Sequence, residues 1–163
     1  MSHLDFLSPD LASADAVWRS PLERALAHAP AEMQDLSRTG VLEVRGELDG
    51  LDAGEAEVVR LTPDRALVLC PFEEAGRLRT RLAGARRSVV DLSAGWAGLQ
   101  VQGEALMRRV TDLDLDRLPA MGSLAHVHAL VLRDGDTFRL YFPQEYGHSV
   151  AEVVVDAAEG LGA

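Results

Sequence analysis

Two histidines, His126 and His128, stand two positions apart in an apolar segment and are the first candidates for chemistry. The pattern of this segment predicts a strand, on which both imidazoles would point to the same side. This arrangement is a known spacing for zinc ligands. No third ligand lies at a suitable spacing, and Leu130 and Leu132 continue the same face toward a core. We therefore expect a structural or interface role and no metal.

Arginines in the middle of the chain form a second candidate site. Residues 61–110 carry eight arginines and five acidic residues, whereas the net charge of the whole chain is −10. In a predicted helix, Arg77 and Arg81 lie four residues apart, and arginines are favoured where proteins bind anions or acidic partners. Glu73 lies four residues before Arg77, so an ordinary pair within the helix explains part of the group. The full set is Arg77, Arg79, Arg81, Arg86 and Arg87.

Two tryptophans are candidate contacts for a partner or a flat ligand. Trp96 comes directly after a predicted turn, and Trp18 lies in an N-terminal segment without sustained periodicity. Aromatic side chains at such positions are typical anchors, although packing in the core explains Trp96 equally well. We predict that residues 1–18 form an arm, disordered by itself or docked on a partner, and that residues 19–163 form a single domain.

No group of residues predicts a catalytic centre. Asp91 ends a strand before a turn, where an aspartate more often caps the turn than acts as a catalytic carboxylate. Ser93 lacks the G-x-S-x-G context of a nucleophile. Cys70, the only cysteine, lies in an apolar strand and is expected to be buried and inert. The alternating aspartates of residues 112–116 lack the glycine and terminal glutamate of a calcium loop. We predict no catalytic residue and no metal ligand.

Composition is that of an ordinary soluble globular protein. The 163 residues are 47% hydrophobic and 26% charged. No apolar run approaches the ~18 residues of a membrane span. The negative charge opposes binding to nucleic acid or to an anionic membrane. The chain has no lysine, which excludes a Schiff-base lysine and a Walker motif, and its single cysteine excludes an intrachain disulfide. We expect a cytoplasmic protein.

Two halves of the chain repeat a series of short motifs, and this repeat predicts the architecture. Each half reads as strand–strand–(helix)–strand–strand–helix, with the bracketed helix of the first half reduced to a loop or a single turn at residues 48–57. Such halves predict an α+β fold, a mixed or antiparallel sheet packed by helices. Residues 119–123 are predicted to be a loop. The matched pairs are residues 35–37 (DLS) with 91–93 (DLS), 42–47 (LEVRGE) with 99–104 (LQVQGE), and Asp64 and Pro71 with Asp136 and Pro143.

Several of these motifs carry a resemblance to a known family. They are VDLS at residues 90–93, LQVQGEA at residues 99–105, DTFRLYFP at residues 136–143 and RSPL at residues 19–22. Their order and spacing resemble the small gamma subunit of heterotetrameric sarcosine oxidase, within the folate-binding aminomethyltransferase (glycine cleavage T-protein) superfamily. The resemblance covers residues 19–158.

The resemblance implies a fold and a role. The fold would be that of the aminomethyltransferase N-terminal domain. Such oxidases demethylate sarcosine and pass the one-carbon unit to tetrahydrofolate. Their large flavoprotein subunits hold FAD, FMN, NAD and the folate site, and the gamma subunit has no known catalytic residue. This chain would then be a non-catalytic subunit that holds no cofactor alone.

The sequence leaves two alternatives open. One is a stand-alone protein of the same fold that binds a pterin or another small molecule through Trp96, His126 and the arginines. The other is an enzyme whose site forms at the interface of a homodimer.

Overall fold

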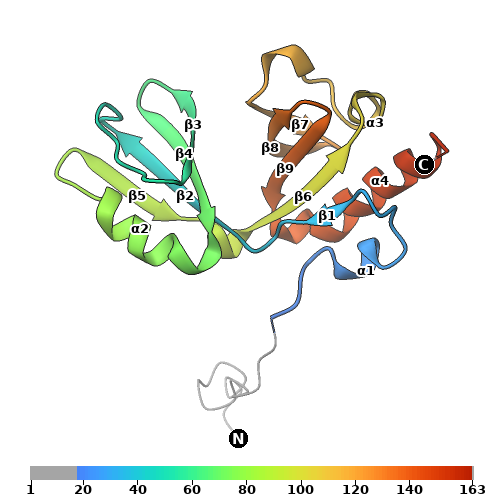
Figure 1. Cartoon of the computed structure of the whole chain (residues 1–163), viewed down its shortest axis with the longest axis horizontal. Helices are drawn as coiled ribbons and strands as arrows, with labels where there is room; N and C mark the ends of the chain where they lie inside the picture. Colours follow the sequence, from blue (N-terminus) through green and yellow to red (C-terminus); the bar gives the residue numbers. More distant parts are fainter. Residues whose placement is uncertain (1–17, 163) are drawn as a thin grey trace, which may run out of the picture.

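The computed structural model describes residues 18–162, so the predicted arm lies outside the described residues except for Trp18. Figure 1 shows two sheets that face each other in a V. The strands are β1 (Gln34–Asp35), β2 (Thr39–Gly46), β3 (Glu57–Thr62), β4 (Arg65–Pro71), β5 (Arg87–Asp91), β6 (Trp96–Gln102), β7 (Ala120–Leu124), β8 (Val127–Asp134) and β9 (Thr137–Pro143). The helices are α1 (Glu23–Leu26), α2 (Ala75–Leu82), α3 (Glu104–Val110) and α4 (Gly147–Glu159), with short 3₁₀ turns η3 (Phe72–Glu74), η4 (Ser93–Gly95), η5 (Leu115–Arg117) and η6 (Gln144–Tyr146).

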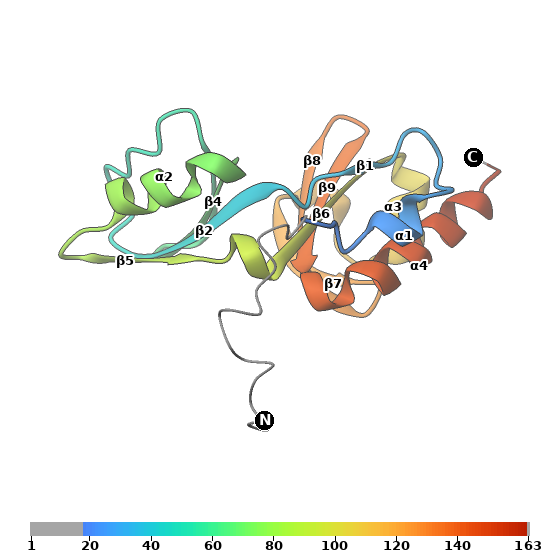
Figure 2. The ribbon, with the colours of Figure 1, turned by 90° about the horizontal axis from the view of Figure 1, so that it is seen from below.

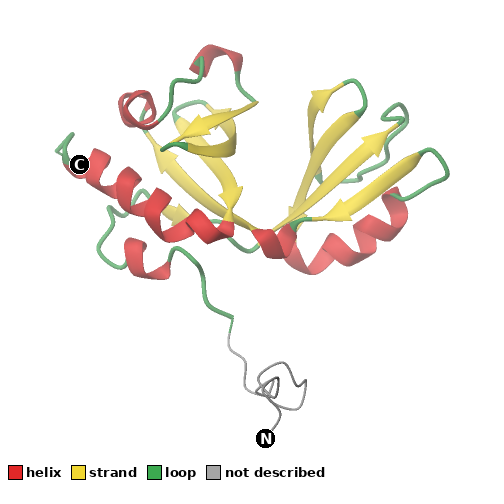
Figure 3. Cartoon of the chain, turned by 180° about the vertical axis from the view of Figure 1, so that it is seen from behind, coloured by secondary structure: helices red, strands yellow, loops and turns green. Residues whose placement is uncertain are grey.

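Each sheet is built mainly from one half of the repeat. The five-stranded sheet has the order β1-β6-β9-β8-β7, the four-stranded sheet has the order β3-β4-β2-β5, and every pairing is antiparallel. Figure 3 shows α2 and α4 along the outer sides of the V, and Figure 2 shows α1 beside α4. The predicted α+β class with two similar halves is confirmed, and its strands are divided between two sheets.

The two halves exchange their first strands. β1, from the first half, pairs with β6 of the second half through Gln34 and Gln100. β5, which opens the second half, pairs with β2 of the first half from Asp91 to Arg87. Each sheet therefore contains one strand from the other half of the sequence.

Three apolar clusters stabilise this arrangement. Two of them lie between a sheet and its helices, as expected for amphipathic elements. In α2, Ala75, Leu78 and Leu82 form the buried stripe that the sequence predicts. The third cluster joins the two sheets, with Leu67 and neighbouring residues from one sheet and Tyr141 and its neighbours from the other. The facing sides of the V therefore share a core.

The prediction of a loop at residues 119–123 is wrong. Ala120–Leu124 forms β7, which pairs with β8 along its whole length. Its sequence, AMGSL, has only two large apolar residues, Met121 and Leu124, and they are separated by a glycine and a serine. The apolar and β-branched residues that usually indicate a strand are therefore few. Gly122 is suited to this strand because the side chain of Leu113 packs directly against its backbone.

Candidate functional site

An aromatic pocket lies at the junction of the two halves. Trp18, Phe72 and Trp96 supply its aromatic lining, and its volume is ≈ 260 Å³. Elements from both halves border it, because η3 begins at Phe72 after the first half's Pro71, and η6 begins at Gln144 after the equivalent proline. The other lining residues are Arg19, Pro21, Ser37, Ser93, Ala94 and Gln144. We call this site the junction pocket.

The serines of the two DLS motifs line the junction pocket. Asp35 Oδ1 accepts a hydrogen bond from the Ser37 N–H at 2.8 Å, and Asp91 Oδ1 accepts one from the Ser93 N–H at 3.0 Å. These are Asx turns, in which an aspartate caps its own turn. The prediction that Asp91 caps a turn is confirmed. Both serines are buried, with only 6% exposed.

The structure brings the two predicted tryptophans together in the junction pocket. Trp96 begins β6 opposite Pro143 and also packs against the cluster between the sheets, as the packing interpretation predicts. Trp18 is 52% exposed. The guanidinium carbon of Arg38 lies 5.8 Å from the Trp18 ring centroid, in cation–π range, and Arg38 also forms an ion pair with Glu73.

Sequence reasoning missed the other lining residues of the junction pocket. A usable signal existed, because Phe72 and Gln144 follow the two equivalent prolines of the repeat. Ser37 was likewise indicated as the counterpart of Ser93. The repeat shows that such positions correspond, but it does not show that they meet.

Arg77 and Arg81 lie elsewhere, on α2. They line a depression of ≈ 280 Å³ together with residues 53–56 and Glu74. The predicted pair between Glu73 and Arg77 is wrong: Glu73 contacts Arg38. The cause is local, since Glu73 belongs to η3 and precedes the α-helical geometry that an i, i+4 pair needs. Among residues 18–162, Arg77 and Arg81 form no ion pair.

His126 and His128 do not share one face of a strand, so that prediction is wrong. Ala125 and His126 have φ values of 46° and 65° and form the two-residue turn between β7 and β8. His128 lies on β8 opposite Ser123 and is exposed. Within the described part of the chain, no group of three or more His, Cys, Asp and Glu side chains could hold a metal ion.

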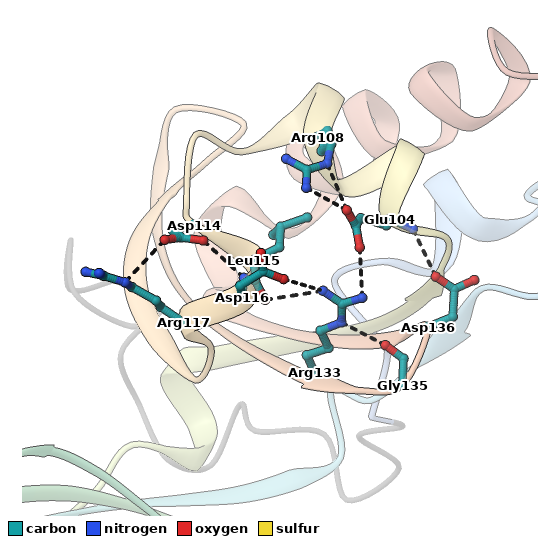
Figure 4. Close-up of polar contacts among 9 residues, drawn as sticks. All are labelled: Glu104, Arg108, Asp114, Leu115, Asp116, Arg117, Arg133, Gly135 and Asp136. Carbon is teal, nitrogen blue, oxygen red and sulfur yellow. Dashed lines mark hydrogen bonds and ion pairs between the residues drawn. The ribbon is translucent and has the colours of Figure 1, made fainter.

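A polar cluster connects α3 to the β8–β9 hairpin. Glu104 accepts hydrogen bonds from Arg108 at 2.6 Å and 2.9 Å and from Arg133 at 2.8 Å. Arg133 also donates to the carbonyls of Leu115 and Gly135 (Figure 4). The hydrogen bonds from Arg108 and Arg133 lower the pKa of Glu104. Because its charges are satisfied internally, this cluster is better suited to structure than to binding.

Two buried groups outside the junction pocket also have structural explanations. Glu43 on β2 is 5% exposed and pairs with Arg45 and Arg65. Burial raises the pKa of Glu43, but the hydrogen bonds and charges of the two arginines outweigh it, and the pKa is lowered overall. Burial raises the pKa of the Cys70 thiol, which keeps the thiol protonated and agrees with its predicted inertness.

Two solved structures have a similar arrangement of helices and strands to this chain. One chain of heterotetrameric sarcosine oxidase from Corynebacterium sp. U-96, in complex with pyrrole 2-carboxylate, matches with a TM-score of 0.70 and 21% identity, over 91% of this chain and 98% of that chain. The aminomethyltransferase T of the glycine cleavage system from Bartonella henselae matches with a TM-score of 0.58 and 19% identity. The chain has the fold of these two proteins. The resemblance found in the sequence motifs is thereby confirmed for the fold.

The remaining comparisons support a shared fold and no more specific relationship. The aminomethyltransferase match covers 87% of this chain but 52% of that protein, so this chain corresponds to about half of it. A ligand-free regulatory subunit of aspartate kinase from Thermus thermophilus matches with a TM-score of 0.50 and 10% identity, over 77% of this chain and 96% of that chain. No protein-family model and no curated protein matches the sequence. None of the described helices is long and apolar enough to cross a membrane.

Proposed function

We propose that this chain is a non-catalytic subunit of a multi-subunit oxidase of the heterotetrameric sarcosine oxidase type. The observation that supports the proposal is the extent of the match. It covers 98% of one chain of that heterotetramer and 91% of this chain. The aminomethyltransferase match covers only 52% of its target. A match to nearly the whole of one chain of a heterotetramer favours a subunit role for the matched region.

In this proposal the large subunits are flavoproteins that hold FAD, FMN, NAD and tetrahydrofolate and perform the oxidative N-demethylation. This chain contributes to assembly. The junction pocket supports that role, because Trp18 and Phe72 remain partly exposed beside Trp96. Aromatic residues are enriched at protein interfaces and often carry much of the binding energy.

Co-production with the large flavoprotein subunits encoded by the same organism tests the proposal. We expect a single species in size-exclusion chromatography, with a native mass that includes this chain and with flavin absorbance in the same peak. Circular dichroism of the isolated chain provides the folding control. A folded chain that elutes separately from every co-produced flavoprotein subunit would refute the subunit role.

A stand-alone ligand-binding protein is the second candidate, and the junction pocket favours it. Two tryptophans line one pocket, where a flat pterin ring can stack on an indole. Titration with tetrahydrofolate should then quench tryptophan emission. The variants Trp18→Phe and Trp96→Phe report which ring responds. An emission spectrum that stays constant up to the highest soluble concentration of tetrahydrofolate would exclude this candidate.

A further inference from the structure

Strand β5 forms an open edge of the four-stranded sheet. It pairs with β2 on one side, and no other strand among residues 18–162 pairs with its second side. The side chain of Val90, near its end, is 46% exposed. An edge strand presents unpaired backbone groups and can serve as a template for an additional strand.

The backbone hydrogen bonds show which groups of β5 face outward. The Leu92 N–H donates to the Val41 carbonyl at 2.8 Å, and the Arg86 carbonyl accepts a bond from the same neighbouring segment at 3.2 Å. In an antiparallel pair, residues that bond to the neighbour alternate with residues that point away. The even-numbered positions therefore bond toward β2, and the N–H and C=O groups of Val89 and Asp91 face the open side.

The other sheet edges are less suitable for strand addition. β1 has only two residues. β3 contains a register shift between Arg60 and Thr62. The end of β7 is occupied by Thr111, whose hydroxyl donates to the Ser123 carbonyl and which forms a bridge with Leu124. Short strands, irregular register and covered ends are features that discourage strand addition. β5 has a regular ladder of five residues. A bridge to Gly84 takes up the outward N–H of Arg87 at 3.2 Å and leaves the outward groups of Val89 and Asp91 open.

Arginines surround the β5 edge. Arg87 begins the strand, and Arg86 precedes it with a side chain that is 82% exposed. Arg79 lies on α2, which packs against β5. On the helix, Arg79 lies on the opposite flank from Arg77 and Arg81, because each residue turns the helix by about 100°. Since Arg77 and Arg81 line the depression beside residues 53–56, Arg79 lies on the β5 flank.

These positive charges are weakly compensated. Arg79 forms no ion pair among the described residues, and Arg86 pairs with the half-exposed Glu47 at 3.2 Å. An exposed pair of this kind is worth little and can exchange partners. Asp91 is the acidic residue at the far end of the strand, where its Oδ1 already accepts a hydrogen bond from Ser93. The edge therefore offers outward-facing backbone groups beside a local excess of positive charge.

We propose that β5 binds an extended, acidic segment of a partner protein as an added strand. The backbone groups of Val89 and Asp91 supply main-chain hydrogen bonds, and carboxylates of the added strand pair with Arg79 and Arg86. A second copy of this chain is the competing occupant, because antiparallel pairing of two β5 edges would place Arg87 opposite Asp91, and self-association through β5 is therefore one of the outcomes that overturn the proposal. This inference deepens the proposed subunit role and rests on it for the existence of such a partner.

A peptide of alternating glutamate and valine tests the site directly, with a lysine–valine peptide as the matched control. We expect the backbone amide resonances of Val89 and Asp91 to shift with the acidic peptide, and the basic peptide to bind at least about tenfold more weakly. Val89→Pro removes one outward N–H and leaves the ladder with β2 intact, so it should abolish binding in a chain that remains folded by circular dichroism. Equal binding of both peptides, shifts confined to other strands, or a chain that self-associates through β5 would overturn the proposal.

Charge reversal provides an independent test that does not alter the strand. Arg86→Glu should weaken binding of the acidic peptide about tenfold, and wild-type affinity should fall as salt is added. Arg117→Glu is the matched control, because Arg117 is 85% exposed and likewise forms one ion pair, with Asp114. An equal loss of affinity in both variants would show that net charge matters and that the β5 edge does not.

Co-production with the flavoprotein subunits separates the two proposals. If the acidic peptide binds at β5 and no complex forms, the site is supported and the subunit role is refuted. If a complex forms and is unaffected by both Val89→Pro and Arg86→Glu, the subunit role is supported and β5 is refuted as its contact. If the complex is lost in Val89→Pro and Arg86→Glu but forms with the wild-type chain and with Arg117→Glu, both the subunit role and the β5 site are supported.

Discussion

Ser37 and Ser93 occupy equivalent positions in the two halves, and each binds the backbone of the opposite half. The Ser93 hydroxyl oxygen accepts a hydrogen bond from the Val41 N–H at 3.0 Å, and the Ser37 hydroxyl oxygen accepts one from the Gly98 N–H at 3.3 Å. Val41 and Gly98 are also equivalent, since both directly precede the repeated L-x-V-x-G-E segment. The two serines therefore connect the halves where the first strands are exchanged.

Ser93→Ala should lower the free energy of unfolding by about 1–3 kcal/mol, because the buried Val41 N–H loses its acceptor. Urea denaturation measures this change. Ser37→Ala should cost less, since its bond to Gly98 is longer. Ser149→Ala, at an exposed position of α4, is the control and should stay within about 0.5 kcal/mol of wild type. Equal effects at Ser93 and Ser149 would contradict the connecting role.

Gly98→Ala should destabilise the protein by about 1–3 kcal/mol, because a Cβ atom there would lie 2.7 Å from the Leu36 carbonyl oxygen. The end of β1 would have to move. Gly76→Ala in α2 is the matched control, since nothing lies within 4 Å of its added methyl group. That variant should be more stable by about 0.5–1 kcal/mol, because alanine favours the helix. Thermal unfolding that ranks the two variants in the reverse order would be inconsistent with this packing.

The sequence predicted the repeat correctly because its motifs determine local turns. The turn at Asp91 and Ser93 needs only residues that are neighbours in the chain, and the same holds for its copy at residues 35–37. The exchange of β1 and β5 between the two sheets could not be predicted from such local motifs. Leu36 and Leu92 directly follow the exchanged strands and pack into the cluster between the sheets, a contact that residue types and spacing do not reveal.

The sequence predicted which types of residue form the candidate site, but it did not predict how these residues lie relative to one another. The type and position of Trp18 and Trp96 make them candidates, but their meeting in one pocket depends on the path of the intervening chain. The sequence predicts a strand at His126 because its turn, Ala125–His126, lacks the glycine or asparagine that usually marks positive φ. The open edge of β5 depends only on the order of strands in the sheet.

Acid should destabilise the protein partly through Glu43. Its folded-state pKa is lowered by Arg45 and Arg65 despite burial, so its contribution is present above the unfolded pKa, near 4.5, and is lost as the pH falls through the folded value. Glu43→Gln should cost about 1–2 kcal/mol at neutral pH and show a smaller loss of stability below about pH 4.5. Glu145→Gln, an exposed residue of η6, is the control. Parallel pH curves for Glu43→Gln and wild type would rule out this contribution.

Arg139 and Glu57 join the two sheets by a bidentate ion pair, from β9 to β3, with N–O distances of 2.6 Å and 2.9 Å. A double-mutant cycle with Arg139→Gln and Glu57→Gln should give a coupling of about 1 kcal/mol, because the fork geometry is favourable but both groups are partly exposed. The coupling should decrease at high salt.

The pair Arg117–Asp114 provides the contrast for this cycle. It joins residues within one turn, its N–O distance is 3.3 Å, and both side chains are mostly exposed. Its coupling should therefore be close to zero. If the two cycles gave equal values, the Arg139–Glu57 pair would contribute no more than an ordinary surface contact, and the apolar cluster between the sheets would have to hold them together without it. A larger value for Arg139–Glu57 would instead show that charge reinforces that cluster at the point where strands from both halves face each other.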